Sequence, residues 1–384
     1  MLKIFQMCSS RAWGGMEMQV VHLAVQLEGR GHEVVVLCFP GSPIFKASRG
    51  RGLECMAIAL DSYFQPPLTF QLGRFLRRRK FDILHCHYSK DLWHLIPATE
   101  CTGGGSVILS KGVGPGKRKN DPLHSWLYMH VDCLIAKSEY LHHRIIEAYP
   151  IDPKRVVTLN NGVDLNVFDP ESQNRDRVRN ELSVQEEELL VGIVGRITPA
   201  KGHMEFLKAA SNVRKQFPCS KFLIVGGSSS DESWYEEKIK RLAVELGLGE
   251  TVVFTGHRED IPTLLSALDL FALTSYTEAF PNVLIEAMAM KKACVATRAG
   301  GVLDVVEDGT CVSLVPPGDA RALSEALVCL LGDEEKRKAL GRAARRRVEK
   351  KFNLHHMIAA LEELYLHIRN GERLDGGRSH VLAE

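Results

Sequence analysis

The sequence predicts an α/β protein with two doubly wound domains, each built on a parallel sheet. Its 384 residues exceed what one hydrophobic core usually holds. Short apolar runs alternate with segments whose apolar residues recur at helical spacing, which is typical of parallel βα units. A polar, charged stretch separates two such series. We therefore expect a first domain over residues 1–170, a linker over 171–188 and a second domain over 189–352.

The first domain opens with a strand at residues 2–7, a glycine turn and a helix at 16–28. Gly14 and Gly15 form the turn and would let a ligand approach the backbone closely. They are not part of a G-x-G-x-x-G fingerprint, which disfavours a dinucleotide dehydrogenase. Further strands are expected at residues 32–38, 54–60, 81–87, 107–111 and 131–136.

Two histidines stand at the end of the strand expected at residues 81–87. A period of two places His85 and His87 on one face of the sheet. A pair without a third ligand is weak support for a metal site. Ligands of parallel sheets bind at the carboxyl ends of the strands, so we expect both histidines, His85 and His87, to line that edge.

A basic, glycine-rich loop follows the strand at residues 107–111. It contains Gly112-Val-Gly-Pro-Gly116 with four cations in or beside it: Lys111, Lys117, Arg118 and Lys119. The spacing fails the P-loop pattern, which excludes an NTPase of that class. Open amides and cations favour an anionic acceptor instead. The basic end of a helix at residues 70–80 is expected to complement the helix dipole, with acidic lipid or a phosphorylated acceptor as the alternative partner.

The second domain alternates strands and helices in the same way. Strands are expected at residues 189–194, 221–225, 252–254, 268–273 and 294–297, and helices at 204–217, 236–246, 261–267, 320–331 and 334–350. After the strand at 268–273, a loop leads to Pro281, which suits the first turn of a helix, and strong helix formers predict a helix from Val283 onward. Glu278 then lies in the loop and Glu286 in the helix. The ordinary alternative is that Glu278 is an acid at the N-terminus of the helix and Glu286 a solvated side chain, neither with a binding role.

Two cations are expected at a neighbouring turn of the same sheet. The strand at residues 189–194 runs into Gly195-Arg196, and Lys201-Gly202 precedes a helix from about His203. Such turns lie at the carboxyl edge of a parallel sheet, where helix amides also attract anions. Two cations and two carboxylates at one edge fit a nucleotide diphosphate sugar. The cations would bind the diphosphate and the carboxylates would bind ribose and sugar hydroxyls.

Composition excludes several classes of protein. A net charge of +2 argues against a general nucleic-acid binder, and ten scattered cysteines without a C-x-x-C pair or zinc spacing indicate reduced thiols. The chain starts directly with a strand, which leaves no room for a signal peptide, and no apolar run approaches the roughly 18 residues of a membrane span. We expect a cytoplasmic protein, with any membrane contact peripheral and on the inner face of the cell membrane.

These motifs resemble the retaining GT-B glycosyltransferases of family 4. The run from Glu278 to Glu286 is similar to the family's E-x7-E signature, and residues 195–202 to its diphosphate motif. Asn161-Gly-Val-Asp164, Gly300-Gly301 and Val315-Pro-Pro-Gly-Asp319 follow in the family's order and spacing. The resemblance covers the C-terminal half well and the N-terminal half loosely, and it extends to bacterial cell-envelope and lipopolysaccharide sugar transferases.

The resemblance implies a fold and a set of residue roles. Two Rossmann-like domains would face a cleft, a helix at 353–370 would cross back to the first domain, and 371–384 would form a flexible tail. The implied catalytic residues are Glu278, Arg196 and Lys201. The implied donor-binding residues are Glu286, Gly15, Phe280, Pro281, Asn282, Gly300 and Gly301, the last two through helix amides. The candidates for the acceptor or the cleft are Gly14, His87, Lys111 and Lys117, with Lys111 standing where many members have His.

The predicted reaction transfers a sugar from a nucleotide diphosphate sugar to a hydroxyl, without a cofactor or a metal. The acceptor is expected to be a glycolipid or a cell-envelope saccharide precursor. The first 170 residues carry 20 Lys and Arg against 15 Asp and Glu, which favours an anionic acceptor or an anionic membrane surface. Two alternatives remain: a nucleotide-sugar 2-epimerase on the same fold, and a non-catalytic sugar-binding protein. The base, the sugar and the acceptor stay open.

Overall fold

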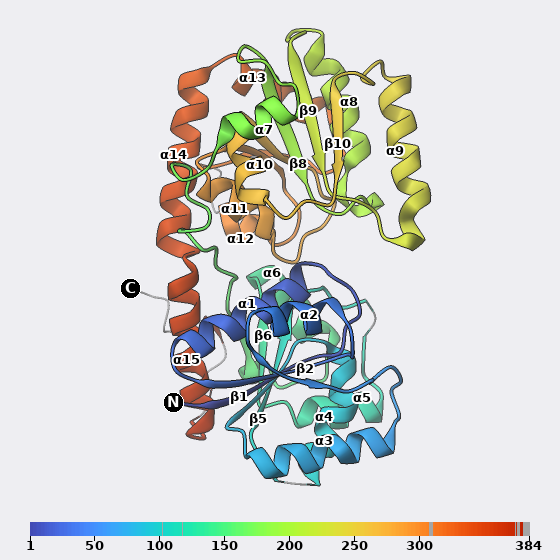
Figure 1. Cartoon of the computed structure of the whole chain (residues 1–384), viewed down its shortest axis with the longest axis vertical. Helices are drawn as coiled ribbons and strands as arrows, with labels where there is room; N and C mark the ends of the chain where they lie inside the picture. The colour runs from blue at the N-terminus through green and yellow to red at the C-terminus, as the bar shows by residue number, and fades with distance from the viewer. Residues whose placement is uncertain (102, 117, 307–309, 373, 375–376, 379–384) are drawn as a thin grey trace. The chain divides into compact units, whose positions relative to one another are not determined.

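The structure is a computed structural model, and it describes the chain except residues 102, 117, 307–309, 373, 375–376 and 379–384. Helices and strands alternate along the described chain and build two parallel sheets (Figure 1). Contacts divide the chain into two units, Met1–Asn160 with His355–Glu384, and Asn161–Leu354. The predicted class, two Rossmann-like α/β domains, is confirmed.

The first unit is built on an eight-stranded sheet of order β14-β7-β6-β5-β4-β1-β2-β3. Its strands are β1 (Lys3–Cys8), β2 (Glu33–Cys38), β3 (Glu54–Ala57), β4 (Ile83–Cys86), β5 (Ser106–Lys111), β6 (Cys133–Ala136), β7 (Val156–Thr158) and β14 (Gly377–Arg378). All pairings are parallel. The central strands are buried along their length, as strands covered by helices on both faces must be.

Helices cover this sheet, and several begin at a polar cap. They are α1 (Gly15–Gly29), α2 (Pro43–Gly50), α3 (Pro66–Arg79), α4 (Leu92–Glu100), α5 (Pro122–Met129), α6 (Glu139–Ala148) and α15 (Leu354–Arg369). The side chains of Ser42, Asp121 and Ser138 each accept a hydrogen bond from the backbone amide three residues later in the sequence. This bond satisfies an amide of the first helical turn that has no partner within the helix.

The last long helix, α15, packs in the first unit, beside α1 (Figure 1). Tyr365 is fully buried, and its hydroxyl lies 2.5 Å from Nδ1 of His85. Glu362 accepts from Arg30 at 2.5 Å and lies 2.6 Å from Nε2 of His32. Polar contacts inside the first unit therefore fix this helix, as the resemblance implied.

The second unit is built on a six-stranded parallel sheet of order β10-β9-β8-β11-β12-β13. Its strands are β8 (Leu189–Val194), β9 (Ser220–Val225), β10 (Val252–Gly256), β11 (Leu270–Leu273), β12 (Ala293–Thr297) and β13 (Ser313–Val315). Its helices are α7 (Arg175–Glu181), α8 (His203–Arg214), α9 (Ser233–Glu245), α10 (Ile261–Ala267), α11 (Asn282–Ala289), α12 (Val302–Val306), α13 (Ala320–Leu331) and α14 (Glu334–Lys351). Two apolar clusters, one on each face, form its core.

Residues 171–188, expected as a linker, contain helix α7 and belong to the second unit. Arg179 explains the difference, because its guanidinium is buried and donates to the carbonyls of Gln185 and Glu188 at 2.6 Å. It also pairs with Asp269 at 3.2 Å. A stretch that looks polar in sequence is thus fixed through a buried cation with satisfied donors. In the described part of the chain, no helix has both the length and the apolar character needed to cross a bilayer.

Candidate functional site

Two loops of the second unit lie side by side at the carboxyl ends of the neighbouring strands β8 and β11. The hydroxyl of Thr274 donates to the carbonyl of Lys201 at 2.7 Å. The amide of Tyr276 donates to the carbonyl of Ala200 at 2.8 Å. The two sequence motifs, more than 70 residues apart, are therefore joined by hydrogen bonds, as the parallel topology predicted.

Gly202 makes this close approach possible. Its φ is +68°, a conformation that other residues adopt only with strain. A Cβ at this position would lie 2.1 Å from the carbonyl oxygen of Thr274, well inside contact distance. Glycine is therefore required at residue 202 for two independent reasons, backbone conformation and space.

Lys201 and Glu278 form the charged centre of the two loops. Nζ of Lys201 lies 2.5 Å from Oε1 of Glu278, and the hydroxyl of Ser275 donates to the same oxygen at 2.6 Å. The Glu278 side chain is 9% exposed and that of Lys201 31% exposed. The contacts from Lys201 and Ser275 are both made to Oε1 of Glu278.

Glu286 lies on α11, which starts at Asn282, one residue before the predicted start. Burial raises the pKa of its carboxyl from 4.5 to about 7. No cation of the described chain lies within ion-pair distance of it, in contrast to Glu278. A desolvated carboxyl without a counter-ion is suited to accept hydrogen bonds from ligand hydroxyls.

Other predicted residues of the second unit are placed differently. Arg196 is 67% exposed, and its Nε lies 3.9 Å from Glu232, the outer limit of an ion pair. Phe280 is buried in the core against Phe352, with ring centroids 5.9 Å apart, so its ring shapes the loop from inside. Pro281 is buried and precedes α11, and Asn282 accepts a hydrogen bond from Asn161 at 2.9 Å.

The turn at Gly300 and Gly301 opens helix α12 as predicted, but its first amides are not free. The amide of Gly301 donates to the carbonyl of Glu278 at 2.9 Å, and that of Val302 to Ala299 at 3.2 Å. The expectation of an open amide is therefore wrong for Gly301, because a hydrogen bond to Glu278 already uses it. The glycine turn instead supports the loop that carries Glu278.

In the first unit, Gly14 and Gly15 are the cap and first residue of α1. His85 and His87 lie on one face as predicted, with ring centroids 4.1 Å apart. His87 is buried and bonded to Gln6, and burial lowers the pKa of its imidazole to about 3. His85 uses both ring nitrogens, on Tyr365 and on Ser110. The described residues contain no cluster of three or more potential metal ligands.

The basic loop after β5 is partly described, and Lys117 lies outside the described residues. Nζ of Lys111 donates to the hydroxyl of Ser89 at 2.9 Å and lies 5.7 Å from the centroid of the Tyr149 ring. Burial, with the nearby charge of Lys119, lowers the pKa of Lys111 to about 8. This lysine is therefore a desolvated cation at the carboxyl end of β5.

Sequence reasoning did not select Lys137, a second desolvated cation in this unit. Its side chain is buried directly after β6, and burial lowers the pKa of its ammonium to about 8. No carboxylate in the described part of the chain lies within ion-pair distance of it. The available signal was its position, a lysine immediately after a predicted strand, like Lys111 at the end of β5.

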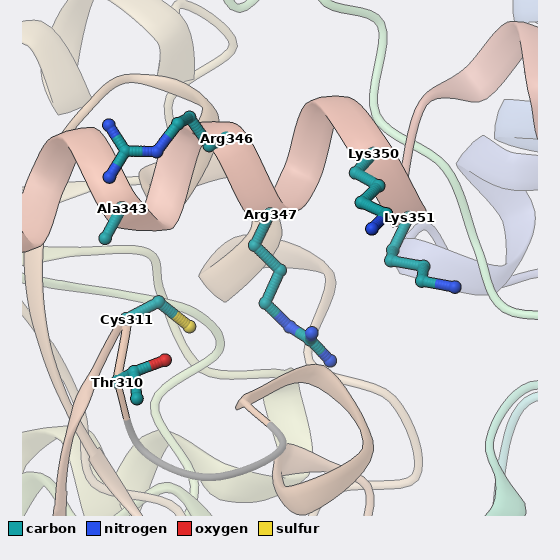
Figure 2. Close-up of a pocket in the computed structure, with 7 residues that line it drawn as sticks. All are labelled: Thr310, Cys311, Ala343, Arg346, Arg347, Lys350 and Lys351. Carbon is teal, nitrogen blue, oxygen red and sulfur yellow. The ribbon is translucent and has the colours of Figure 1, made fainter.

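A hollow of about 360 Å³ lies elsewhere in the second unit, against α14. Figure 2 shows its lining residues: Thr310, Cys311, Ala343, Arg346, Arg347, Lys350 and Lys351. None of the predicted site residues lines it. Arg347 donates to the backbone carbonyls of Asp304 and Val305, which gives it a role in fixing α12.

Two family models match the chain. The model described as Glycosyltransferase Family 4 matches residues 13–167, and the one described as Glycosyl transferases group 1 matches residues 174–347. Similar proteins include the D-inositol 3-phosphate glycosyltransferase of Corynebacterium jeikeium, 27% identical over 95% of each chain. The enzyme of that name from Mycolicibacterium smegmatis is 29% identical over 92% of this chain and 86% of its own.

Solved structures with a similar fold include a glycosyltransferase from Rickettsia africae. Its TM-score is 0.86 at 23% identity, covering 96% of this chain and 98% of that one. Anabaena HepE, solved in complex with UDP and glucose, has a TM-score of 0.84 at 23% identity, covering 95% and 99%. At such identities the likeness establishes the architecture.

Proposed function

Because this chain belongs to the group 1 glycosyltransferases of family 4, with the GT-B fold, we propose that it transfers a sugar from a nucleotide diphosphate sugar to an acceptor hydroxyl, with retention of configuration. One observation carries the proposed site. The ion pair between Lys201 and Glu278 and the unpaired, part-buried carboxyl of Glu286 belong to the segments that follow two adjacent strands.

Lys201 and Arg196 are assigned to the diphosphate. Arg196 is exposed and only loosely held by Glu232, so it is free to turn toward a ligand. Lys201 is held in place through its backbone by Thr274, and its ammonium would face the growing negative charge of the leaving group. Removing one preorganised donor of this kind typically costs about 3–4 kcal/mol of transition-state stabilisation. We assign this work to cations, without a metal.

The two carboxylates are assigned to hydroxyl groups of the donor. Glu286 would accept hydrogen bonds from the ribose hydroxyls. Such hydrogen bonds are stronger in a desolvated environment than in water. Glu278 would hold hydroxyls of the transferred sugar through Oε2, with Oε1 held by the hydroxyl of Ser275. Glu278 is also the carboxylate we assign to face the reacting carbon.

The acceptor is proposed to be anionic and to belong to a glycolipid or a cell-envelope saccharide. The support comes from the first unit, where Lys137 is buried, Lys111 is part-buried, and neither cation has a carboxylate partner in the described chain. A desolvated cation has lost much of its hydration, so a bound anion stabilises it more than it would stabilise a solvated cation. The names of the relatives, D-inositol 3-phosphate glycosyltransferases, contain a phosphorylated compound, which supports the proposal of an anionic acceptor.

Donor binding is the first test, by thermal unfolding with UDP, GDP and ADP. A nucleotide at about 100 times its dissociation constant should stabilise the wild type by about 2.7 kcal/mol. The shift should shrink in Lys201→Ala and Glu286→Ala, each compared with its own ligand-free protein. It should persist in Lys208→Ala, which removes an exposed lysine of α8. Lack of a shift with all three nucleotides would contradict the proposal.

The reaction itself is tested by NMR of the products. Transfer with retention predicts that the anomeric configuration of the donor sugar reappears in the product, and only when an acceptor is present. A 2-epimerase would instead convert the donor without an acceptor. A non-catalytic sugar-binding protein would bind the donor and leave it unchanged.

A further inference from the structure

Exposed apolar side chains gather in one part of the first unit. Of the sixteen large apolar side chains that are exposed in the described chain, eight come from residues 63–129. These eight are Tyr63, Phe64, Phe70, Tyr88, Val113, Leu123, Trp126 and Met129. Isolated exposed apolar residues are ordinary, but a concentration in about a sixth of the chain marks an interaction surface.

Ring contacts connect several of these residues into one surface. The ring of Tyr63 lies 5.7 Å from that of Trp93, which lies 5.3 Å from that of His124, with both pairs edge to face. Phe64 follows Tyr63 and is 81% exposed, and Leu123 precedes His124 and is 61% exposed. We call Tyr63, Phe64, Trp93 and Leu123 the aromatic surface.

The aromatic surface lies at the edge of the first sheet where the candidate acceptor residues lie. Its members come from the segment after β3, from the start of α4 after β4, and from the start of α5 after β5. In a parallel sheet the carboxyl ends of all strands share one edge, and Lys111 ends β5 at that edge. The aromatic surface therefore adjoins the basic loop.

The charge around the aromatic surface is positive. Nζ of Lys90 lies 5.2 Å from the centroid of the Tyr63 ring, and Arg118 is exposed in the basic loop. Of the acids nearby, Asp61 forms an ion pair with Arg11 at 3.5 Å, and Asp121 lies 2.6 Å from Nδ1 of His124. Cations beside exposed tyrosine and phenylalanine match the interface of an anionic bilayer, where rings enter the headgroup layer and cations meet phosphates.

We propose that the aromatic surface docks on an anionic lipid bilayer and that the acceptor is a lipid-linked saccharide presented from that bilayer. The second part rests on the proposed transferase function, whereas the docking does not. A soluble saccharide stacked on the same rings would also use aromatic side chains. It would not account for Phe64 and Leu123, which have no polar group and are largely exposed.

The test is flotation of the purified full-length chain with vesicles of phosphatidylcholine, with or without phosphatidylglycerol. Wild type should bind vesicles that contain phosphatidylglycerol and bind neutral vesicles much less. The double variant Phe64→Ser with Leu123→Ser should lose at least tenfold in vesicle affinity. Val244→Ser, which removes an apolar side chain of α9 that is 69% exposed, should bind like wild type. Arg118→Gln should weaken binding severalfold, most at low salt.

Several outcomes would overturn the docking proposal. Equal binding of the wild type to vesicles with and without phosphatidylglycerol would contradict it. Vesicle binding by the double variant as strong as that of the wild type would also contradict it. A double variant with unchanged vesicle binding and a raised KM for a soluble saccharide would assign the rings to that saccharide. Retained nucleotide-induced stabilisation shows that the double variant is folded. Vesicle binding without sugar transfer would leave docking in place and reject the transferase function.

Discussion

Replacing Glu286 with Gln should stabilise the ligand-free protein at pH 8 and weaken its binding of a nucleotide sugar. Burial raises the pKa of this carboxyl from 4.5 to about 7, and no cation of the described chain compensates its charge. At pH 8 the folded protein therefore holds a desolvated, unpaired carboxylate. Gln keeps the size of the side chain and removes the charge.

The magnitude follows from proton linkage. Between pH 4.5 and pH 7 the carboxyl is ionised in the unfolded chain and protonated in the folded one, so rising pH favours unfolding. The contribution of Glu286 to stability is greatest below pH 4.5 and falls to its minimum above pH 7. The total loss is about 3 kcal/mol, of which about 2.5 kcal/mol falls between pH 5 and pH 8.

Urea unfolding of the wild type and of Glu286→Gln at pH 5 and pH 8 measures this difference. The free energy of unfolding of the variant, relative to that of the wild type, should rise by about 2.5 kcal/mol from pH 5 to pH 8. Glu237→Gln, at an exposed acid of α9, is the control and should show no such gain. Parallel pH dependences for wild type and Glu286→Gln would refute the reasoning that this carboxyl is desolvated.

The functional half of the prediction has the opposite sign. If ribose hydroxyls bind the carboxylate, the donor selects the ionised form, so a nucleotide sugar should bind wild type more tightly as pH rises from 6 to 8. Binding near pH 7 should then release a proton, which calorimetry in buffers of different ionisation enthalpy detects. Glu286→Gln should lose both the pH dependence and the proton release. Affinity independent of pH in the wild type would place the hydroxyls elsewhere.

Three further predictions concern single contacts. Lys201→Ala should lower kcat by about 10²–10³-fold in steady-state assays with saturating donor, whereas an unchanged kcat would remove Lys201 from the transition state. Gly202→Ala should lower thermal stability by more than Gly247→Ala, since both have φ near +70° but only Gly202 has a neighbouring atom in the way. Tyr365→Phe should cost about 1–3 kcal/mol in urea unfolding, because a buried histidine nitrogen loses its partner, and an unchanged midpoint would contradict this.

The sequence predicts well what depends on local pattern. The strand at residues 189–194 is reproduced as β8, and the helix after Pro281 starts within one residue of its predicted position. The meeting of the two site loops was also predictable, because parallel topology brings strand ends to one edge. Glycine at residue 202 indicated an unusual backbone conformation. The sequence did not show that the carbonyl oxygen of Thr274 leaves no space for a side chain there.

Long-range partners account for what the sequence did not predict. Helix α4 was missed because Pro97 lies inside it, a residue that ordinarily interrupts a helix. The stretch at 171–188 looked like a linker, since nothing local reveals that Arg179 is buried against carbonyls and Asp269. Likewise, the amide of Gly301 appeared open until its partner, the carbonyl of Glu278, was known.

The ion pair of Lys201 with Glu278 links the two ends of the proposed donor. A diphosphate that draws Lys201 toward itself takes a counter-ion from a carboxylate that is only 9% exposed, and such a loss is costly. Sugar hydroxyls that donate to Glu278 would replace the lost contact, whereas a nucleoside diphosphate without its sugar would not. The binding energy of the diphosphate is then fully available only when the sugar is present. On this reasoning the same two side chains would hold the proposed donor and would favour the intact nucleotide sugar over the spent nucleotide, which would assist product release.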